Sequence, residues 1–365
     1  MNNSFTYNFF IPKLTIGGAE TVFVNTCEEI NKRGGNVIII TLYSDVKYHI
    51  NPNITIINVK SIFGFIKYAH RLNKKNNVIF SFMERANLIN LLSYIFLSSN
   101  SVLSVHTAPH KGFKKRKLIN RALIRFTYKL ASFTNIKTVV VSEGIKNDLT
   151  SLFGMNNIKT IPNFLLSDEQ KFIQDKKQNK DIIITFVGRL EYIKGCDILL
   201  EALYKSSNND IKLNIIGDGS QKKILEDYVV MNKLKEKVNF TGTLSSNQVY
   251  SYLSESNYLI IPSYAEGFGM VVLEGLKNQC KIIYSSCDFG PRDLMEGNFK
   301  YVKSYPFYDP SIDRSLSVDE LSEILNNLDR DVYSKDECEK ILRTLSEEYS
   351  ADVIIPNLIK FLSNK

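Results

Sequence analysis

Short apolar runs alternate with amphipathic helical stretches along almost the whole chain of 365 residues. Runs of this kind are typical of parallel strands that are buried on both faces. In the first half of the chain we predict strands at Tyr7–Ile11, Val37–Thr41, Val78–Phe82, Val102–Val105, Thr138–Val141 and Lys159–Ile161. In the second half we predict them at Ile182–Val187, Lys212–Ile216, Val238–Thr241, Tyr258–Ile261, Lys281–Tyr284 and Lys300–Val302. Strands that alternate with helices predict an α/β fold of two doubly wound, Rossmann-like domains.

A polar stretch separates the two predicted domains. Because the lysine-rich segment Ser167–Lys180 lacks strand alternation, we interpret it as the connection between a first domain, residues 1–165, and a second, residues 181–345. Residues 346–365 form a terminal segment, in which Pro356 should kink the last helix unless that helix begins close to the proline. Open parallel sheets bind ligands beyond the carboxyl ends of their strands, so two facing sheets would share one cleft.

The segment Tyr264–Gly275 combines a glycine loop with two carboxylates, directly after an apolar strand and at the start of a helix. Its glycines allow a tight turn, and the amides at a helix N-terminus favour a phosphate. A carboxylate repels a bare phosphate, so we predict that Glu266 binds hydroxyls of a donor sugar and Glu274 those of a ribose. The amides predicted to bind the phosphate are those of Gly267, Phe268, Gly269 and Met270.

A second cluster, Phe186–Gly195, presents two cations at the exit of a strand. Arg189 offers a planar fork to two oxygen atoms, and Lys194 offers a mobile point charge. Together they suit a diphosphate leaving group, whose negative charge grows as its bond to a sugar breaks. A third glycine turn, Gly17–Gly18, follows the first strand and opens a helix, so its amides are candidates for the same ligand. Taken alone, an ordinary strand-to-helix turn is the simpler interpretation of Gly17–Gly18.

Six motifs follow one another along the chain. They are GGAE near the start, VSEGIKNDL at Val141–Leu149, IPN at Ile161–Asn163, GRLEYIKG, LNIIGDG at Leu213–Gly219, and the block with Glu266 and Glu274. In this order they resemble the retaining glycosyltransferases of family four, over most of the chain. The resemblance implies the GT-B fold: two Rossmann-like domains that face each other across a cleft, with a C-terminal segment that crosses back onto the first domain.

Two further pieces resemble the subgroup that builds lipopolysaccharide, O-antigen, capsule and other bacterial surface glycans. They are Ser81–Phe82 with Asn87, and Gly290-Pro291-Arg292-Asp293. Members usually have glutamate where this chain has Asp293, whose shorter side chain changes the reach of the carboxyl group. The family often places a histidine near the donor sugar at the position of His106, which follows a predicted strand.

The resemblance implies transfer of a sugar from a nucleoside diphosphate to a hydroxyl of a growing, lipid-linked glycan, with the anomeric configuration retained. By family habit the nucleotide is UDP. The second domain would bind the nucleotide sugar and the first the acceptor. Arg189 and Lys194 would stabilise the departing diphosphate, and His106 would bind a further sugar hydroxyl. The partial match at Gly290 to Asp293 implies galactose or an N-acetylhexosamine, hence a hexosyl- or N-acetylhexosaminyltransferase.

Two other functions remain as alternatives. A sugar-nucleotide epimerase shares the architecture but needs acid–base carboxylates and histidines, and the four histidines form no such constellation. A non-catalytic membrane-surface binder would have a degenerate site, whereas Arg189, Lys194, Glu266 and Glu274 are all present. An oxidoreductase is disfavoured, because Gly217-Asp218-Gly219 lacks the third glycine of a dinucleotide-binding motif.

Composition indicates a soluble, cytoplasmic protein without a metal cofactor. The hydrophobic content is 44 %, and five cysteines without paired spacing indicate a reducing compartment. The N-terminal run FTYNFFIPKL predicts a strand rather than a leader, and polar residues interrupt Leu88–Val105, the best candidate for a membrane span. The one Asp-x-Asp motif, Asp329–Asp331, lies in a predicted helical tail, away from the strand ends where a metal-bridged diphosphate would bind.

The net charge of +8 is unevenly distributed, with +14 in residues 1–167 and −6 in the remainder. Much of the excess lies in Lys111–Lys129, a predicted basic amphipathic helix. Its apolar positions, at four-residue spacing, are Leu118, Ala122, Phe126 and Leu130. Each basic residue near an anionic leaflet contributes roughly 1 kcal/mol, so we predict peripheral binding to the inner face of the cell membrane. Nucleic acid is disfavoured, because no nucleic-acid-binding motif accompanies the charge.

Overall fold

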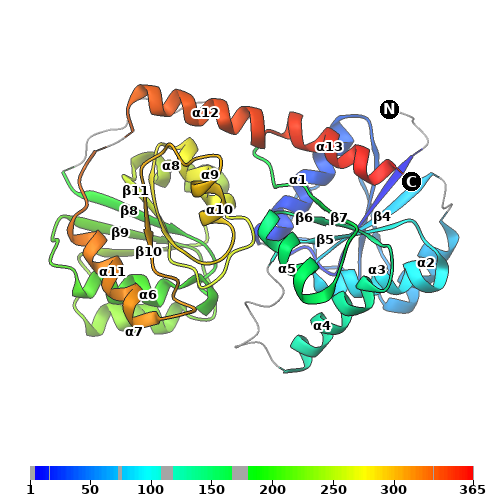
Figure 1. The fold of residues 1–365 in the computed structure, drawn as a ribbon, viewed down its shortest axis with the longest axis horizontal. Helices are drawn as coiled ribbons and strands as arrows, with labels where there is room; N and C mark the ends of the chain where they lie inside the picture. Colours follow the sequence, from blue (N-terminus) through cyan, green and yellow to red (C-terminus); the bar gives the residue numbers. More distant parts are fainter. Residues whose placement is uncertain are drawn as a thin grey trace. The chain divides into compact units, whose positions relative to one another are not determined.

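The computed structural model describes the chain in six stretches, with the side chains of residues 118–120 left out. They are residues 5–15, 17–72, 76–107, 118–166, 180–331 and 333–364. The chain divides into a first unit, Met1–Ser167 with Tyr349–Lys365, and a second unit, Asp168–Glu348. Each unit contains one parallel sheet with helices on both faces (Figure 1). This confirms the predicted α/β fold with two Rossmann-like sheets.

The sheet of the first unit has seven parallel strands in the order β3-β2-β1-β4-β5-β6-β7. The strands are β1 (Thr6–Ile11), β2 (Asn36–Thr41), β3 (Thr55–Asn58), β4 (Asn77–Phe82), β5 (Ser101–Val105), β6 (Lys137–Val140) and β7 (Ile158–Thr160). The prediction missed β3, a four-residue edge strand whose side chains are half-buried or exposed. An edge strand needs no long apolar run, so the hydrophobic pattern does not reveal it.

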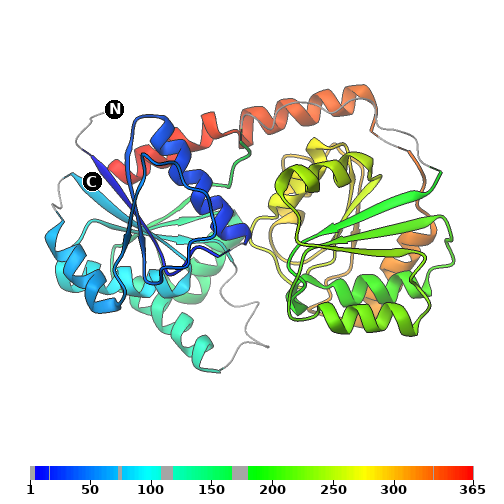
Figure 2. The ribbon, with the colours of Figure 1, turned by 180° about the vertical axis from the view of Figure 1, so that it is seen from behind.

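Helices cover both faces of this sheet (Figures 1 and 2). On one face lie α1 (Gly18–Lys32) and α13 (Ala351–Ser363), and on the other α2 (Ile62–Arg71), α3 (Glu84–Leu97), α4 (Leu118–Ser132) and α5 (Glu143–Phe153). Under α1 and α13 the aromatic rings of Phe9, Phe23, Phe80 and Phe82 pack mostly edge to face, with centroids 4.9–6.1 Å apart. This geometry suits the ring quadrupoles and adds to the gain from burial.

The last helix, α13, contributes to the core of the first unit. Ile354, Ile355, Leu358 and Leu362 are buried there, among the side chains of β1 and β4. Pro356 is the sixth residue of α13, and the helix continues through it to Ser363. A proline at that position removes one backbone hydrogen bond, and the buried apolar face offsets this loss.

The sheet of the second unit has six parallel strands in the order β10-β9-β8-β11-β12-β13. They are β8 (Ile182–Val187), β9 (Ile211–Ile216), β10 (Val238–Gly242), β11 (Tyr258–Ile261), β12 (Lys281–Ser285) and β13 (Ser304–Phe307). One face carries α6 (Cys196–Lys205), α7 (Lys222–Met231) and α11 (Arg314–Asn326), and the other α8 (Ser246–Glu255), α9 (Met270–Lys277) and α10 (Pro291–Glu296). Helix α12 (Lys335–Tyr349) precedes α13 in the chain.

The last strand of this sheet differs from the prediction. The run Lys300–Val302 forms a turn, and the strand is Ser304–Phe307, in which Pro306 pairs with Tyr284 of β12. Proline cannot donate a backbone hydrogen bond and is rare inside a sheet. An edge strand tolerates it, because one side of the strand has no neighbour.

In both sheets the order of the strands reverses at one place. The chain winds outward in opposite directions from β1 and β4 in the first sheet, and from β8 and β11 in the second. Such a switch point leaves a crevice at the carboxyl ends of its two central strands, which is where open α/β sheets bind ligands. A ligand-binding site is therefore expected at the loops after β1, β4, β8 and β11.

Helix α4 buries a different face from the one that the predicted apolar stripe would bury. Its buried side chains include Ile124, Tyr128 and Ala131, whereas Ala122 and Phe126 are exposed. The four-residue spacing was therefore read on the wrong face. The first part of the predicted basic helix, residues 111–117, lies outside the described part of the chain. So do residues 167–179, which make up most of the predicted interdomain connection. Among the described residues, no helix combines the length and the apolar character needed to cross a bilayer.

We expect Leu358→Ala to destabilise the first unit by about 2–5 kcal/mol, because the truncated side chain leaves a cavity in that core. Leu358 is 5 % exposed, and Val353 on the same helix is 37 % exposed, so Val353→Ala is the matched control. Calorimetry of the full chain should show that Leu358→Ala lowers the same melting transition as Phe80→Ala. Equal melting temperatures for Leu358→Ala and Val353→Ala would contradict a core role for α13.

Candidate functional site

The residues predicted to bind a ligand in the second unit come from two loops that follow neighbouring strands. Strands β8 and β11 pair in parallel on either side of the switch point. The loop after β8 carries Arg189 and Lys194, and the loop after β11 carries Glu266. Because parallel strands end at the same edge of a sheet, side chains 72 residues apart in sequence meet there.

Lys194 and Glu266 are in direct contact. The Nζ atom of Lys194 lies 2.6 Å from Oε1 of Glu266, and the Ser263 hydroxyl donates a hydrogen bond of 2.7 Å to the same oxygen. The Glu266 side chain is 11 % exposed and that of Lys194 is 24 % exposed. Partial exclusion of water strengthens a charge-assisted hydrogen bond and makes an unpaired charge costly. The cation predicted for a diphosphate and the carboxylate predicted for a sugar therefore form one ion pair.

The two loops that carry this ion pair are locked together by their backbones. The amide of Tyr264 donates to the carbonyl of Ile193 at 2.9 Å, and the rings of Tyr192 and Tyr264 stack with centroids 4.4 Å apart. Gly195 has φ +68°, and a Cβ at this position would collide with the carbonyl of Pro262. Glycine is therefore required at position 195 both for its backbone conformation and for the close approach of the second loop.

A third loop, which follows β12, supports the glycine loop from the other side. Gly290 has φ +82°, and a Cβ there would lie 2.8 Å from Cβ of Glu266. Gly269 has φ +85°, and its Cβ would lie 3.2 Å from the ring of Pro291. Residues 267–269 are buried. The glycine loop is thus a packed element that fixes the backbone of Glu266 and the start of α9.

Arg189 and Glu274 lie on the segments that follow the same two strands. Arg189 is exposed at the end of β8. Hydrogen bonds from the hydroxyl and the amide of Ser220, together with the charge of Arg189, hold the pKa of Glu191 below its usual value. Within the described residues, no ion pair joins Arg189 to Glu266. Glu274 is half-buried, one turn into α9.

The Gly17–Gly18 turn of the first unit contains a carboxylate of its own. Glu20, in the first turn of α1, is 9 % exposed, and its carboxylate folds so close to Gly17 that a Cβ there would collide with it. The hydroxyl of Tyr48 lies 3.2 Å from the Gly17 amide. A negative side chain at a helix N-terminus is stabilised by the helix dipole. It also repels a phosphate at the position where the glycine turn was predicted to bind one.

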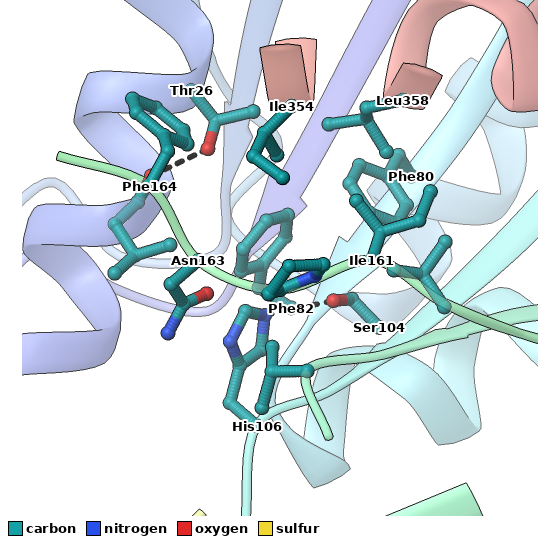
Figure 3. A pocket seen from close by; sticks show the side chains of 14 residues that line it. Thr26, Phe80, Phe82, Ser104, His106, Ile161, Asn163, Phe164, Ile354 and Leu358 are labelled. Atoms are coloured by element: carbon teal, nitrogen blue, oxygen red, sulfur yellow. Dashed lines mark hydrogen bonds between the residues drawn. The ribbon is translucent and has the colours of Figure 1, made fainter. Parts of the chain in front are cut away.

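His106 follows β5 and lines a small, mostly apolar pocket of the first unit (Figure 3). Its ring stacks on Phe82 with centroids 4.7 Å apart, and Nε2 lies 2.7 Å from the hydroxyl of Ser104. Nδ1 is shielded from solvent and has no hydrogen-bond partner among the described residues. Asn163 lies beside the ring in the same pocket. Burial lowers the pKa of His106 to about 4, so the imidazole is neutral at pH 7.

The residues Ser81 and Asn87, which contributed to the family resemblance, belong to a buried polar network. The Ser81 hydroxyl donates to Oδ1 of Asn87 at 2.8 Å, and Nδ2 of Asn87 donates to the carbonyl of Ser104 at 2.8 Å. Asn90 donates to the Ser81 hydroxyl at 3.0 Å. Since buried polar networks hold their members rigidly, this one supports the end of β5, directly before His106.

The Asp-x-Asp motif lies at the opposite edge of the second sheet. Asp329 accepts a hydrogen bond from the Tyr258 hydroxyl at 3.0 Å and pairs with Lys281 at 3.3 Å. Tyr258 and Lys281 are the first residues of β11 and β12, so Asp329 lies at their amino ends. Within the described residues, no cluster of three or more histidine, cysteine or acidic side chains is arranged to hold a metal ion.

Two family models match consecutive parts of this chain. Residues 16–165 match the model described as "Glycosyltransferase Family 4", and residues 167–327 match the model described as "Glycosyl transferases group 1". The boundary between the models falls close to the division between the two structural units. Together the models cover every strand of both sheets except β1.

Curated relatives of this chain are named as glycosyltransferases. An uncharacterised glycosyltransferase of Methanocaldococcus jannaschii is 29 % identical over 225 residues, which cover 56 % of this chain and 57 % of the relative. The amylovoran biosynthesis glycosyltransferase AmsD of Erwinia amylovora is 25 % identical over 302 residues, covering 79 % and 82 %. The N-acetylgalactosamine-N,N'-diacetylbacillosaminyl-diphospho-undecaprenol 4-alpha-N-acetylgalactosaminyltransferase of Campylobacter jejuni is 28 % identical over 222 residues, covering 59 % of each. The chain thus spans little more than half the length of two of these relatives.

A solved structure shares the fold of this chain along its whole length. HepE of Anabaena, solved in complex with UDP, aligns with a TM-score of 0.75 at 14 % identity and covers 98 % of this chain and 99 % of its own. At this level of identity the likeness shows the fold alone.

The imidazole of His106, whose Nδ1 atom is shielded from solvent, generates a prediction about pH. The folded pKa of about 4 lies below the value of about 6.5 in an unfolded chain, so the unfolded state binds the proton more readily. Stability is therefore full above about pH 6.5 and falls as the pH drops towards 4, by up to about 3 kcal/mol. Urea unfolding at several pH values should show this loss in the wild type and in His70→Gln, an exposed control. In His106→Gln the loss should be absent, and an NMR titration that gives His106 a pKa near 6.5 would contradict the account.

Proposed function

Since this chain belongs to the glycosyltransferases of family four and has their GT-B fold, we propose that it transfers a sugar from UDP to a hydroxyl of a bacterial surface glycan, with retention at the anomeric carbon. One observation carries this proposal. The ion pair between Lys194 and Glu266, 2.6 Å apart, lies at the carboxyl ends of β8 and β11, where a doubly wound sheet binds its ligand. A cation for the diphosphate and a carboxylate for the sugar are thereby held side by side.

Departure of the nucleoside diphosphate is the step that these cations assist. Negative charge accumulates on the phosphate oxygens as the bond to the anomeric carbon breaks, and a cation already in place stabilises that charge without reorganisation. Lys194 supplies such a cation beside the sugar, and Arg189 supplies a second at the exit of β8. The N-terminus of α9, beginning at Met270, adds the positive end of a helix dipole.

The carboxylates hold the sugar and the nucleoside. Glu266 accepts hydrogen bonds from sugar hydroxyls and favours the positive charge that develops on the ring, and Glu274 binds the ribose. His106 is neutral at pH 7, and for it to exchange a hydrogen bond with a further sugar hydroxyl its shielded Nδ1 must become accessible when the donor binds. In the retaining step the acceptor oxygen bonds to the anomeric carbon on the face that the phosphate leaves. The acceptor proton passes to a phosphate oxygen.

The proposed donor and acceptor take their support from the relatives. The Erwinia protein is named as a glycosyltransferase of amylovoran biosynthesis, and the Campylobacter protein for transfer of N-acetylgalactosamine to an undecaprenol-linked acceptor. The HepE structure contains UDP. We therefore assign UDP-linked hexose or N-acetylhexosamine as the donor, and a growing, lipid-linked glycan as the acceptor. The Gly17–Gly18 amides remain candidates for the same diphosphate, although the carboxylate of Glu20, close to Gly17, would have to move away before a phosphate could bind there.

We expect Lys194→Met and Glu266→Gln each to lower kcat by about 10²- to 10³-fold, because each removes charge stabilisation at the reacting bond. The measurement is a screen of UDP-sugars with a lipid-linked acceptor, in which released UDP and extended acceptor are quantified by mass spectrometry. Lys223→Met is the control, since Lys223 pairs with Asp227 at 2.8 Å on the exposed face of α7.

The outcomes of this screen separate the candidate functions. UDP release with acceptor extension in the wild type, lost in both site variants and kept in Lys223→Met, supports the proposal. An isomerised nucleotide sugar without extension would indicate an epimerase, and binding without turnover would indicate a non-catalytic protein. Turnover near the wild-type rate in both Lys194→Met and Glu266→Gln would refute the assigned roles.

We further propose that the first unit binds an anionic membrane surface through α4. The outward side of this helix exposes Leu123 and Phe126, and Phe133 is exposed in the turn directly after it. The basic side chains of Arg125 and Lys129 are exposed on the same helix. Phe126 and Phe133 are 56 % and 76 % exposed. Exposed aromatic side chains beside cations suit the boundary between lipid headgroups and acyl chains. The lysine-rich residues 111–117, directly before α4, add to this charge.

The double variant Phe126→Ser/Phe133→Ser should lower co-sedimentation with phosphatidylglycerol vesicles about tenfold, because two apolar contacts with the bilayer are lost. Met231→Ser is the control: Met231 is 81 % exposed, but it lies on α7 of the second unit. Binding of the wild type should weaken in high salt and be absent with phosphatidylcholine alone. Equal sedimentation of the double variant and the wild type would contradict the proposed surface.

A further inference from the structure

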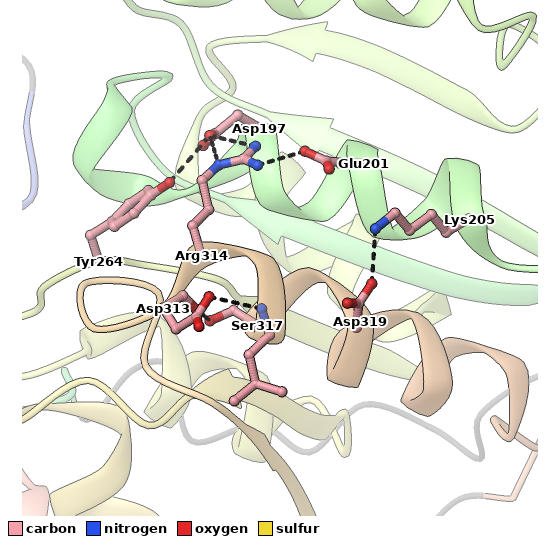
Figure 4. Close-up of polar contacts among 9 residues, drawn as sticks. Asp197, Glu201, Lys205, Tyr264, Asp313, Arg314, Ser317 and Asp319 are labelled. Carbon is pink, nitrogen blue, oxygen red and sulfur yellow. Dashed lines mark hydrogen bonds and ion pairs between the residues drawn. The ribbon is translucent and has the colours of Figure 1, made fainter.

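Helices α6 and α11 are joined by a row of polar contacts along their length (Figure 4). At one end, Arg314 donates to Oδ2 of Asp197 at 3.2 Å and contacts Oε2 of Glu201 at 2.7 Å. One turn further along α6, Lys205 pairs with Asp319 at 2.8 Å. The contacts therefore run parallel to the two helix axes, and the Arg314 end lies where α6 begins, directly after Lys194 and Gly195.

Arg314 has an unusual position on its own helix. It is the first residue of α11, after the N-cap Asp313. A cation at a helix N-terminus is disfavoured by the helix dipole. The two carboxylates of α6 outweigh this effect and hold the Arg314 charge, and Asp197 lies in the first turn of α6, where a negative charge is favoured. The ion pair between Arg314 and Asp197 is therefore stabilised both by the second carboxylate, that of Glu201, and by the dipole of α6 at Asp197.

Asp197 connects this ion pair to the loops of the candidate site. The Tyr264 hydroxyl donates to Oδ2 of Asp197 at 3.3 Å, so that Tyr264 and Arg314 share one carboxylate oxygen. Tyr264 precedes Glu266 by two residues and is locked to the loop of Lys194 by its amide and its ring. A continuous set of contacts thus leads from Arg314 to both members of the Lys194–Glu266 ion pair.

We propose that Arg314 is a positioning residue for the donor site, which acts by holding Asp197 and Tyr264 and through them the two loops that carry Lys194 and Glu266. This inference rests on the proposed function, which identifies these loops as the donor site. The restraint that Arg314 places on the two loops through Asp197 and Tyr264 can be tested without any substrate. Within the described residues, Arg314 forms no hydrogen bond or ion pair with Lys194 or Glu266. Its effect on a ligand is therefore indirect.

The same pair of helices provides a matched control. The Lys205–Asp319 ion pair joins α6 to α11 as Arg314 does, and Lys205 is 41 % exposed where Arg314 is 40 % exposed. Asp319→Asn removes one exposed ion pair between these helices, whereas Arg314→Gln removes two ion pairs to carboxylates that are 31 % and 30 % exposed. Both effects on global stability should be small, with that of Arg314→Gln the larger. Only Arg314 is connected to Tyr264.

The first measurement is amide hydrogen exchange of the full chain without substrate, for Arg314→Gln, Asp319→Asn and Tyr264→Phe. We expect exchange of residues 192–195 and 263–270 to become at least about tenfold faster in Arg314→Gln, because the contacts that restrain these loops are lost. Asp319→Asn should leave these segments as in the wild type. Tyr264→Phe keeps the stacked ring and removes only the hydroxyl, so it tests the link if Arg314→Gln fails to fold.

The second measurement is the kinetics of the same variants with the nucleotide sugar that the wild type uses. Looser loops should raise the donor KM of Arg314→Gln about tenfold, whereas simple loss of folded protein would lower kcat alone. Tyr264→Phe should raise the same KM, and the double variant should show less than the sum of the two effects, because both act on one path. Asp319→Asn should leave KM unchanged.

Failure of this inference is distinguishable from failure of the proposed function. If the wild type turns over no nucleotide sugar, the proposed function fails and hydrogen exchange still decides whether Arg314 restrains the two loops. Wild-type exchange in the two loops of both Arg314→Gln and Tyr264→Phe would overturn the positioning role, whatever the activity. So would equal effects of Arg314→Gln and Asp319→Asn.

Discussion

The ion pair between Lys194 and Glu266 is the interaction on which the rest of the account depends. It forms because two parallel strands, β8 and β11, end side by side at the switch point of a doubly wound sheet. Its 2.6 Å separation is maintained by packed backbone: Gly195 allows the loops to approach, and Gly290 supports Glu266 from the next loop. A half-buried pair of opposite charges at this position can stabilise charge that develops during group transfer, provided that each partner binds its part of a sugar donor.

Much of the fold could be predicted from the sequence, because buried parallel strands need continuous apolar runs and those runs are visible. The two errors in strand assignment, at β3 and β13, both concern edge strands, where a neighbour is missing on one side and neither apolar side chains nor a free amide is required. On α4 the periodicity alone selected the wrong face. Exposed Phe126 and buried Tyr128 are both aromatic, and only the packing against the sheet tells them apart.

The motifs predicted which loops would matter, but not how their side chains pair. From the sequence, Lys194 and Glu266 are assigned to different parts of a ligand. Their contact with each other could not be predicted, because the residues are 72 positions apart and meet only in the folded chain. Likewise Ser263, Asp197 and Arg314 carry no motif, and their importance follows from shared hydrogen bonds. The phosphate-binding role of the Gly17–Gly18 turn stays a prediction, and the sequence motif did not reveal that the carboxylate of Glu20 lies close to Gly17. The low pKa of His106 results from burial, which only the folded chain provides.

The most direct measurement of the central claim is a crystal structure of the protein grown with UDP. The account predicts density for the diphosphate at the carboxyl ends of β8 and β11, with phosphate oxygens within hydrogen-bond distance of Nζ of Lys194 and the guanidinium of Arg189. The ribose should lie against Glu274. A diphosphate bound at another edge of either sheet, with the Lys194–Glu266 ion pair untouched, would contradict the account.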